Sequence, residues 1–506
     1  MNLLEVDGLC KYFDLSGGLT IRNVDRGVIV ADQLLVYEDS VMNGGMLLNR
    51  RHLDGIADSM SRLTDDLAFT DGVEGERYQM LCYFTARYDA AASVPLIRFY
   101  EDYFRDVKIP EQAAEQMAKA TGEKPAPIVF PGSDRARAAA ESLNVAAGRW
   151  SDAIAAQLTG RKVRHDQVNI DREDVDAAFA AVPLPRRGAD SSSAFLQLVH
   201  IDGEVGAVLN MIGPGYGKSM SRFLHLFPRH YTEAVKEANL RASRHSRLVE
   251  LRDASSHNAN LHPPLLDCEI SSPGAQTSFR REDQLPVTDV LVRVGDDGTL
   301  WLVRASTGER IEVLDLGFQG LNGRSQMFRM LVRGFTRAHY VRRMPLYRAS
   351  TIAWERTLKR GSDSDTEIVA RPRLVYDRRI VLQRRTWTIP LNCLPLRARG
   401  ESEGAYFSRI DEWRSAHGMP EYVFAFVTRE RGQVDPKNSK LQRDDYKPQF
   451  ISFRNWFCVA VFEKLISRVD KMLMIEEMLP GPQDMLEIDG RHYPMELVMQ
   501  WSPRAA

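Results

Sequence analysis

The amino-acid sequence predicts an α+β fold in which helices are combined with several mostly antiparallel sheets. Two observations lead to this prediction. Apolar residues recur with helical periodicity through much of the first half of the chain. The second half is rich in short runs of β-branched and aromatic residues separated by turn dipeptides. We therefore divide the chain into a mainly helical part, residues 28–260, and a β-rich part, residues 261–506.

Helical periodicity predicts helices over residues 49–67, 75–88, 135–158 and 231–253. Pro95 marks a break after the second helix, and the pair Pro263 and Pro264 closes the fourth. Residues 108–127, KIPEQAAEQMAKATGEKPAP, are polar and predict a mobile excursion between helices.

The strands follow in the second half, in the segments LLDCEISS, TDVLVRVGDDGTLWLVRASTGERIEVL and LVYDRRIVLQRRTWTIPL. Asp297–Gly298 and Thr307–Gly308 are placed as hairpin turns within the second segment. In the last hundred residues, YVFAFVTR predicts a strand, and FRNWFCVAVFEKLISRV fits a strand or a helix. A strand pair is expected near the end.

Residues 194–227, AFLQLVHIDGEVGAVLNMIGPGYGKSMSRFLHLF, take an apolar strand into a glycine-rich turn with a lysine, a serine and an arginine. A nucleotide P-loop has this character, but its spacing fails here. The signature needs a glycine five positions before Gly217, where the chain has Ile212, and Pro214 removes an amide from the cradle. An NTPase is therefore disfavoured.

What remains is a turn suited to an anionic guest. Gly213, Gly215 and Gly217 permit close backbone approach, and Lys218 and Arg222, four residues apart, are expected to share one face of a following helix. The alternative is a hairpin exit turn followed by a solvated basic helix.

Composition narrows the class of protein. The 506 residues include 44% hydrophobic residues, enough for a substantial core. No apolar run approaches eighteen residues and the N-terminus lacks a secretion signal, so we expect no membrane span and a cytoplasmic protein. The five cysteines are widely scattered, which indicates free thiols.

Charge is unevenly distributed although the net charge is −1. The segment from Arg324 to Arg409 contains eighteen arginines and one lysine but only seven acidic residues. Such a segment suits a polyanion or a cluster of carboxylates. For Arg373, Arg378 and Arg379 within this segment, the alternative is a solvated strand edge, where charges suppress aggregation.

Other candidate residues indicate no chemistry. His200, His225 and His230 have no carboxylate or cysteine at ligand spacing, so we expect structural histidines and no metal site. Asp202, Asp296 and Asp297 are assigned to hairpin turns, and the pair Glu476–Glu477 to a local cap.

Six segments in order carry a family resemblance: ARYDAAASVPLIRFYEDY, LNMIGPGYGKSMSRFLHLF, LPVTDVLVRVGDDGTLWLVRASTGERIEVL, RPRLVYDRRIVLQRRTW, EWRSAHGMPEYVFAFV, and EEMLP followed by GRHYPMELVMQW. Together they resemble the N-terminal glutamylation domain of the lantibiotic (lanthipeptide) dehydratases and the related peptide aminoacyl-tRNA ligases. The resemblance spans Val28 to Trp501.

The resemblance implies transfer of an aminoacyl group, typically glutamyl, from tRNA to a Ser or Thr side chain of a ribosomally made precursor peptide. In the ligase branch, the amino acid is joined to the peptide C-terminus instead. Aminoacyl-tRNA is the co-substrate and no other cofactor is expected.

The resemblance also implies roles for particular residues. Arg222 matches a catalytic-site arginine that would hold the glutamyl group or the 3′ end of tRNA, and Asp39 matches an acid that could orient or deprotonate the acceptor. For Asp39 the alternative is a helix N-cap or turn residue. Residues implied in substrate or tRNA binding are Lys218, Ser219, Arg373, Arg378 and Arg379.

The family domain normally begins further upstream and is followed by an elimination domain. The chain, residues 1–506, is thus expected to be a partial domain that needs a partner protein for complete dehydration. The alternative function is a non-catalytic peptide-binding or scaffolding subunit, which would be indifferent to tRNA.

Overall fold

The computed structural model describes residues 2–6, 9–13 and 48–502, apart from residues 165, 189, 243–245, 255–259, 273, 274, 276, 278, 359–365, 428–445 and 489. The chain divides into two units, Met1–Leu47 and Leu48–Ala506. In the first unit, β1 (Asn2–Val6) and β2 (Leu9–Phe13) form an antiparallel pair. All other described elements belong to the second unit.

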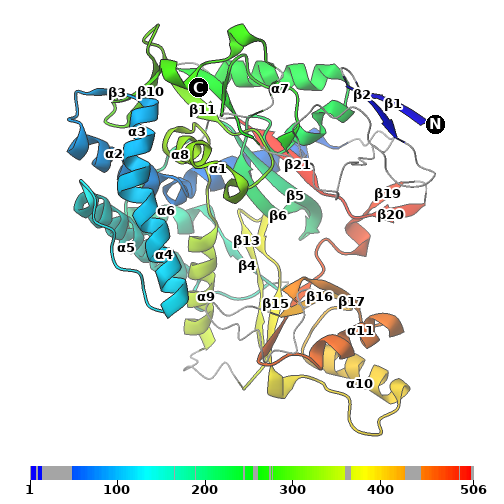
Figure 1. Ribbon diagram of the computed structural model, residues 1–506. Helices are drawn as coiled ribbons and strands as arrows, with labels where there is room; N and C mark the ends of the chain where they lie inside the picture. Colours follow the sequence, from blue (N-terminus) through cyan, green and yellow to red (C-terminus); the bar gives the residue numbers. More distant parts are fainter. Residues whose placement is uncertain are drawn as a thin grey trace. The chain divides into compact units, whose positions relative to one another are not determined.

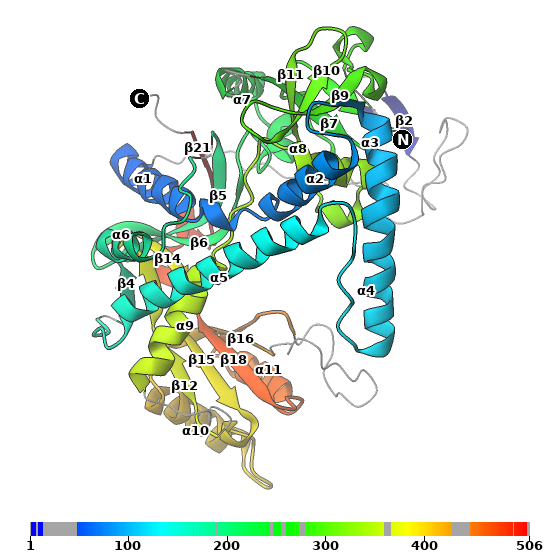
Figure 2. The same cartoon turned by 90° about the vertical axis from the view of Figure 1, so that its left-hand side faces the viewer.

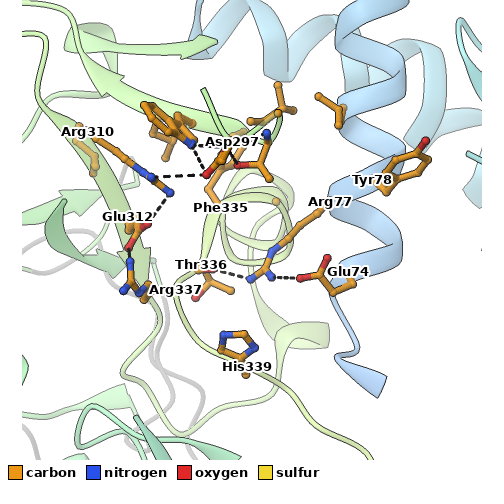
Figure 3. Close-up of a pocket in the computed structure, with 18 of the residues that line it drawn as sticks. Glu74, Arg77, Tyr78, Asp297, Arg310, Glu312, Phe335, Thr336, Arg337 and His339 are labelled. Atoms are coloured by element: carbon orange, nitrogen blue, oxygen red, sulfur yellow. Dashed lines mark hydrogen bonds and ion pairs between the residues drawn. The ribbon is translucent and has the colours of Figure 1, made fainter. Parts of the chain in front are cut away.

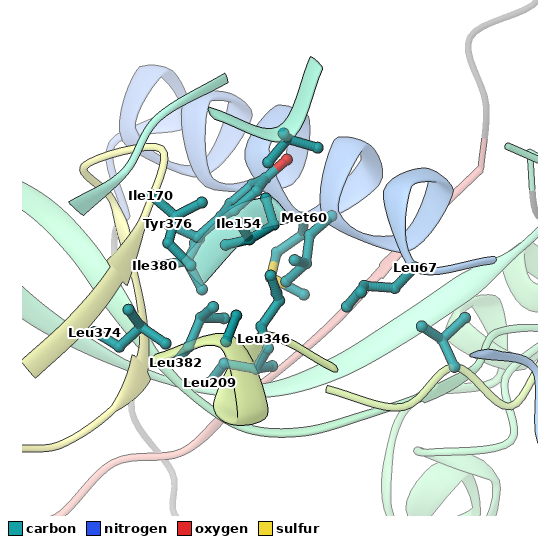
Figure 4. Close-up of a cluster of buried hydrophobic side chains, with 14 of the residues drawn as sticks. Met60, Leu67, Ile154, Ile170, Leu209, Leu346, Leu374, Tyr376, Ile380 and Leu382 are labelled. Atoms are coloured by element: carbon teal, nitrogen blue, oxygen red, sulfur yellow. The ribbon is translucent and has the colours of Figure 1, made fainter. Parts of the chain in front are cut away.

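A six-stranded sheet and four helices build the first core of the second unit (Figure 1). The strands, in spatial order, are β21 (Leu497–Trp501), β5 (Ser192–Ile201), β6 (Glu204–Pro214), β14 (Ile380–Gln383), β13 (Arg373–Tyr376) and β4 (Gln167–Ile170). The helices are α1 (Arg50–Asp66), α5 (Ser133–Leu158), α6 (Arg172–Ala181) and α9 (Met344–Leu358). Figure 4 shows Met60 and Ile154 of the helices meeting Leu209, Leu374 and Ile380 of the strands.

A second six-stranded sheet has its own core. Its strands, in spatial order, are β3 (Ser93–Pro95), β9 (Val290–Val294), β10 (Leu300–Arg304), β11 (Arg310–Leu314), β7 (Arg247–Arg252) and β8 (Glu269–Ser271). The helices packed on it are α2 (Glu74–Arg87), α3 (Leu96–Tyr103) and α8 (Gln326–Phe335). Tyr83, Phe84 and Phe99 supply most of the aromatic packing in this core.

A five-stranded sheet with two helices forms the third core. Its strands are β12 (Val369–Arg371), β15 (Thr386–Pro390), β18 (Met472–Glu477), β16 (Tyr422–Val427) and β17 (Gln449–Ser452), and its helices are α10 (Glu403–Ala416) and α11 (Trp456–Ile466). Ser402 and Asn455 cap the two helices, because each side chain accepts from backbone amides of the first turn.

The remaining described elements are α4 (Ile109–Thr121), α7 (Arg229–Ala242), β19 (Leu486–Ile488), β20 (Arg491–Tyr493), the π-helical η2 (Phe104–Lys108) and the 3₁₀ turns η1 (Ala68–Thr70), η3 (Ser221–Leu226), η5 (Arg281–Asp283), η6 (Val287–Asp289), η7 (Leu321–Gly323), η8 (Leu391–Cys393) and η10 (Pro482–Asp484). Figure 2 shows α3 and α4 following one another along one side of the ribbon.

These elements confirm the α+β class. Most strand pairs are antiparallel, with parallel pairing only for β11–β7, β7–β8, β13–β4 and β14–β6 among the described strands. The hairpin turns are also confirmed, because β9, β10 and β11 pair in succession and Gly298 and Gly308 have positive φ. Asp202 likewise lies in the β5–β6 turn, with φ of 50°.

Two predictions about elements were wrong. Residues 109–121 form α4, although the polar composition of 108–127 predicted a mobile excursion. The helix predicted over 231–253 ends at Ala242, and residues 247–252 form β7 with four buried positions in a row. The segment that fitted a strand or a helix is α11.

Both six-stranded sheets take strands from each side of residue 260. The division into 28–260 and 261–506 therefore describes the order of elements along the chain and not two separate cores. No described helix is both long and apolar enough to cross a membrane. Of the cysteines in the second unit, Cys82 and Cys268 are buried thiols, while Cys393 and Cys458 are partly exposed.

Candidate functional site

The glycine-rich turn packs against its surroundings more closely than a phosphate cradle would. A Cβ at Gly215 would lie 1.9 Å from Ser191 Oγ, and Gly217 has φ of 84° with Val235 only 2.6 Å from a Cβ position. Only glycine fits at these two positions, and the reason is close approach by the chain itself.

Lys218 and Ser219 hold this turn in place. Lys218 Nζ lies 2.8 Å from Asp315 Oδ2 and also donates to the Gly317 carbonyl oxygen. Ser219 Oγ lies 2.6 Å from Ser193 Oγ, which also donates to the Pro214 carbonyl oxygen. Ser219 thus contacts β5, and Lys218 contacts the segment after β11. A substrate role for them stays a prediction.

Arg222 lies in η3, and this corrects the expectation that Lys218 and Arg222 share the face of a following α-helix. A 3₁₀ helix begins at Ser221, so Lys218 belongs to the preceding turn. Arg222 is partly exposed, and its guanidinium carbon lies 5.2 Å from the centre of the Phe223 ring. Asp39 lies outside the described residues.

The basic residues of the second half lie elsewhere. Arg373 forms a bidentate ion pair with Glu477, with Nε–Oε1 at 2.5 Å and Nη2–Oε2 at 2.7 Å. Arg378 is exposed and lies 3.1 Å from Asp171, while Arg379 is partly buried and its carbonyl accepts from the Ala207 amide. Glu477 therefore belongs to a strand ion pair, and the expected local cap at Glu476–Glu477 was wrong.

The structure does not bring these arginines to the glycine-rich turn. Ile380 pairs with Ala207 near the start of β6, whereas the glycine-rich turn follows Pro214 at its end. Seven residues of extended strand separate the two positions by roughly 20 Å. Contacts at both places would require a large ligand.

A cavity of about 400 Å³ lies between α2 and the second sheet (Figure 3). Glu74, Arg77 and Tyr78 line it from α2, and Arg310 and Glu312 face it from β11. The β9–β10 turn, Trp301 of β10, Arg187 and residues of the segment from Gly334 to His339 also line the cavity.

Opposite charges alternate around this cavity. Arg77 lies 2.8 Å from Glu74 and donates to the Thr336 carbonyl at 2.6 Å. Glu312 forms ion pairs with Arg310 at 2.8 Å and with Arg337 at 2.6 Å. The cavity therefore suits a guest with both an ammonium and a carboxylate better than a polyanion.

The cavity and the glycine-rich turn share structural support. The strand that presents Arg310 and Glu312 continues to Asp315, the partner of Lys218. Burial would lower the pKa of Arg337, but hydrogen bonding to Asp190 and the field of Glu312 hold it above its usual value. Burial and the nearby Asp190 raise the pKa of Tyr216, a residue of the turn. Because Asp315 directly follows the strand that lines the cavity and binds Lys218 of the turn, displacing the turn should disturb the cavity.

A buried ionisable group lies behind the turn. The carboxylate of Glu250 is 2.6 Å from Arg252 and 3.5 Å from His262 Nε2. Burial raises the pKa of Glu250 to about 7, against the opposing effect of Arg252. Burial lowers the pKa of His262 to about 3.

Glu250 should make folding stability pH-dependent. Its folded-state pKa lies above the usual 4.5, so the folded state binds the extra proton and loses stability as the pH rises from about 4.5 to about 7. The quantity to compare is the free energy of unfolding of the wild type minus that of the Glu250→Gln variant. We expect this difference to decrease between pH of about 4.5 and about 7 and to stay constant at higher pH. Denaturant unfolding across the pH series measures this difference. A difference independent of pH would show that Arg252 keeps Glu250 ionised throughout.

The three histidines singled out in the sequence differ in their surroundings. His200 Nδ1 lies 3.0 Å from Asp484, while His225 and His230 are exposed. Within the described ranges, no group of three His, Cys, Asp or Glu side chains could hold a metal ion.

Sequence reasoning missed the cavity. Its walls lie more than two hundred residues apart in the chain, on α2 and on β11. Two local signals were present in the sequence. Glu74 and Arg77 lie three residues apart on one helix face, and Arg310 and Glu312 lie two residues apart on one strand face.

A model of the family described as "Lantibiotic dehydratase, N terminus" matches residues 81–440. The match covers well over half of the chain, so the chain belongs to the lantibiotic dehydratase N-terminal family. The match also confirms the resemblance predicted from the sequence. No curated protein matches it.

Solved structures share the fold. The glutamylation domain TbtB from thiomuracin biosynthesis, bound to 5'-phosphodesmethylglutamycin, has a TM-score of 0.62 at 22% identity, covering 90% of this chain and 51% of that chain. TbtB in a second structure gives 0.61 at 22% identity, covering 90% and 50%. The tRNA-dependent lantibiotic dehydratase MibB from Microbispora sp. 107891 gives 0.52 at 16% identity, covering 84% and 37%. The present chain thus spans about half the length of the TbtB chains.

Proposed function

We propose that this chain transfers a glutamyl group from tRNA to Ser or Thr side chains of a ribosomally synthesised precursor peptide. Membership of the lantibiotic dehydratase N-terminal family carries the proposal. The folds of TbtB, a glutamylation domain, and MibB, a tRNA-dependent dehydratase, support it. Aminoacyl-tRNA is the co-substrate, no other cofactor takes part, and the reaction takes place in the cytoplasm.

The reaction is an ester exchange. The peptide hydroxyl oxygen attacks the carbonyl carbon of the aminoacyl ester, and the bond from that carbon to the ribose oxygen breaks. The hydroxyl proton passes to the ribose oxygen, which leaves a glutamyl ester on the peptide and free tRNA. Orienting the two reactants and placing fixed donors near the developing negative charge are the main demands on the protein.

The cavity beside α2 fits the glutamyl group in size and charge. Its α-ammonium would face Glu74 or Glu312, and its side-chain carboxylate would face Arg77 or Arg310. Arg222, anchored through Leu224 on the small core that also contains Ala338, would hold the 3′ end of tRNA.

Intact-mass analysis tests the proposal directly. The chain is incubated with glutamyl-tRNA and a candidate precursor peptide, and we expect the peptide to gain one glutamyl residue. A peptide with Ser and Thr replaced by alanine, and uncharged tRNA, serve as controls. A chain that binds the peptide but ignores tRNA would instead be a scaffolding subunit.

Binding of glutamate tRNA should also fall steeply with salt, because released counterions dominate phosphate binding. Arg378→Ala should reduce the slope of log affinity against log salt by about one unit if its exposed guanidinium contacts a phosphate. Arg137→Ala, a second surface arginine paired within its own helix, should leave the slope unchanged. Fluorescence anisotropy across a salt series measures both. An unchanged slope for Arg378→Ala would remove Arg378 from the tRNA surface.

A further inference from the structure

Aromatic rings are exposed at the corner where η3 meets α7. Phe223, Phe227 and Tyr231 are 37%, 46% and 51% exposed, and they fall within nine consecutive residues. Exposing rings of this size forfeits much of the free energy that burial would provide. An exposed cluster of this kind commonly marks a binding surface. We call Phe223, Phe227, His230 and Tyr231 the aromatic corner.

Buried neighbours hold this corner in its conformation. Leu224 packs in the small core with Tyr216 and Leu316, and Ser221 Oγ donates to the Leu316 carbonyl at 2.7 Å. On α7, the buried Asn239 donates to the carbonyls of Tyr216 and Leu265, both at 3.1 Å. Because the inward faces of both helices are fixed, the rings are presented outward in advance of any ligand.

The rings offer faces and edges suited to stacking. Phe227 and Tyr231 have centroids 5.9 Å apart at an angle of 64°, and His230 lies 4.2 Å from Tyr231. Arg222 lies beside the ring of Phe223. A planar ligand could therefore stack on a ring while an arginine approaches its substituents.

The charge around the corner is cationic. Arg222 and the highly exposed Arg229 flank the rings, and the imidazoles of His225 and His230 are exposed beside them. The acid within this stretch is Glu233, 3.2 Å from Arg229. Aromatic faces with interleaved arginines are typical of sites that bind single-stranded nucleic acid, where unstacked bases meet rings and phosphates meet cations.

We propose that the aromatic corner is a stacking platform for the unpaired 3′-terminal nucleotides of the tRNA. This inference rests on the proposed function and adds the surface that receives the acyl-bearing end. A base-paired stem cannot use the corner in this way, because its bases are already stacked on one another. The site therefore distinguishes the single-stranded end from the rest of the tRNA.

The test compares intact glutamate tRNA with the same tRNA trimmed of its unpaired 3′ nucleotides, by fluorescence anisotropy. The double variant Phe227→Ala with Tyr231→Ala should bind intact tRNA roughly 5- to 150-fold more weakly, as expected for the loss of one stacked base. It should bind trimmed tRNA as the wild type does. The salt slope should not change, because no phosphate contact is removed. Phe227→Trp and Tyr231→Trp should retain binding.

Leu240→Ala is the matched control, because Leu240 is an exposed apolar residue further along α7. Thermal unfolding confirms that each variant folds. If the double variant lost affinity equally for intact and trimmed tRNA, or lost none for either, the stacking platform would be overturned. The wild type would still bind tRNA in that case, so the proposed function would not be affected. Weaker binding of the precursor peptide with unchanged tRNA binding would make the corner a peptide surface. A wild type that binds neither tRNA would overturn the proposed function as well.

Discussion

Arg222→Ala is expected to abolish detectable glutamyl transfer while the chain stays folded. Arg222 is partly exposed in η3 and contributes little to a core, since Leu224 provides the buried anchor of that helix. Removing a fixed donor near developing charge or a bound phosphate typically reduces turnover by about 10²- to 10³-fold. Intact-mass analysis of the peptide measures transfer, and thermal unfolding measures stability.

Arg241→Ala provides the matched control. Arg241 is an exposed arginine at the end of α7, 2.8 Å from Glu237, and it should not affect transfer. Arg222→Lys separates charge from shape, because lysine cannot make the planar bidentate contact. Full activity in Arg222→Ala would exclude the role implied by the family resemblance, and unfolding would identify Arg222 as a structural residue.

Arg373→Ala is expected to lower the free energy of unfolding by about 3–5 kcal/mol, because it leaves a buried carboxylate without its partner. The side chain of Glu477 is only 4% exposed and receives both bonds of the Arg373 guanidinium. Its remaining hydrogen bond comes from the Arg385 amide at 2.8 Å. Denaturant unfolding measures the effect.

A double variant makes this result interpretable. Replacing Arg373 by Met and Glu477 by Leu should recover most of the stability, since an apolar pair removes both charges together. Arg378→Ala should change the free energy of unfolding very little, because its ion pair with Asp171 is exposed. A stable Arg373→Ala variant with weakened tRNA binding would instead place Arg373 on the tRNA surface, as the resemblance implies.

Much of the fold could be predicted because local patterns agree with the final structure. The first helix has a strong apolar stripe and an asparagine cap at Asn49, and the β9–β10–β11 meander has glycines where its turns require positive φ. The prediction over 108–127 failed because polarity was taken for mobility. Helix α4 has no buried residue and depends on good helix formers with Gly122 as its C-cap.

The site was less predictable, because its chemistry depends on partners distant in the chain. Lys218, Ser219 and Arg373 have the residue types of an anion site, but each is engaged with a distant side chain: Asp315, Ser193 and Glu477. A sequence pattern shows which donors are present and leaves open which acceptors fold against them. The cavity between α2 and β11 was missed for the same reason.

For this protein, the sequence by itself determined the α+β class, most helices and hairpins, and the family, because these follow from local periodicity, turn residues and the order of motifs. Only the tertiary structure decided which strands share a sheet, which arginines form ion pairs, and which aromatic rings remain exposed at the η3–α7 corner. The reason is physical. Local structure depends on neighbours within a few residues, whereas burial and charge pairing depend on residues that meet only when the chain folds.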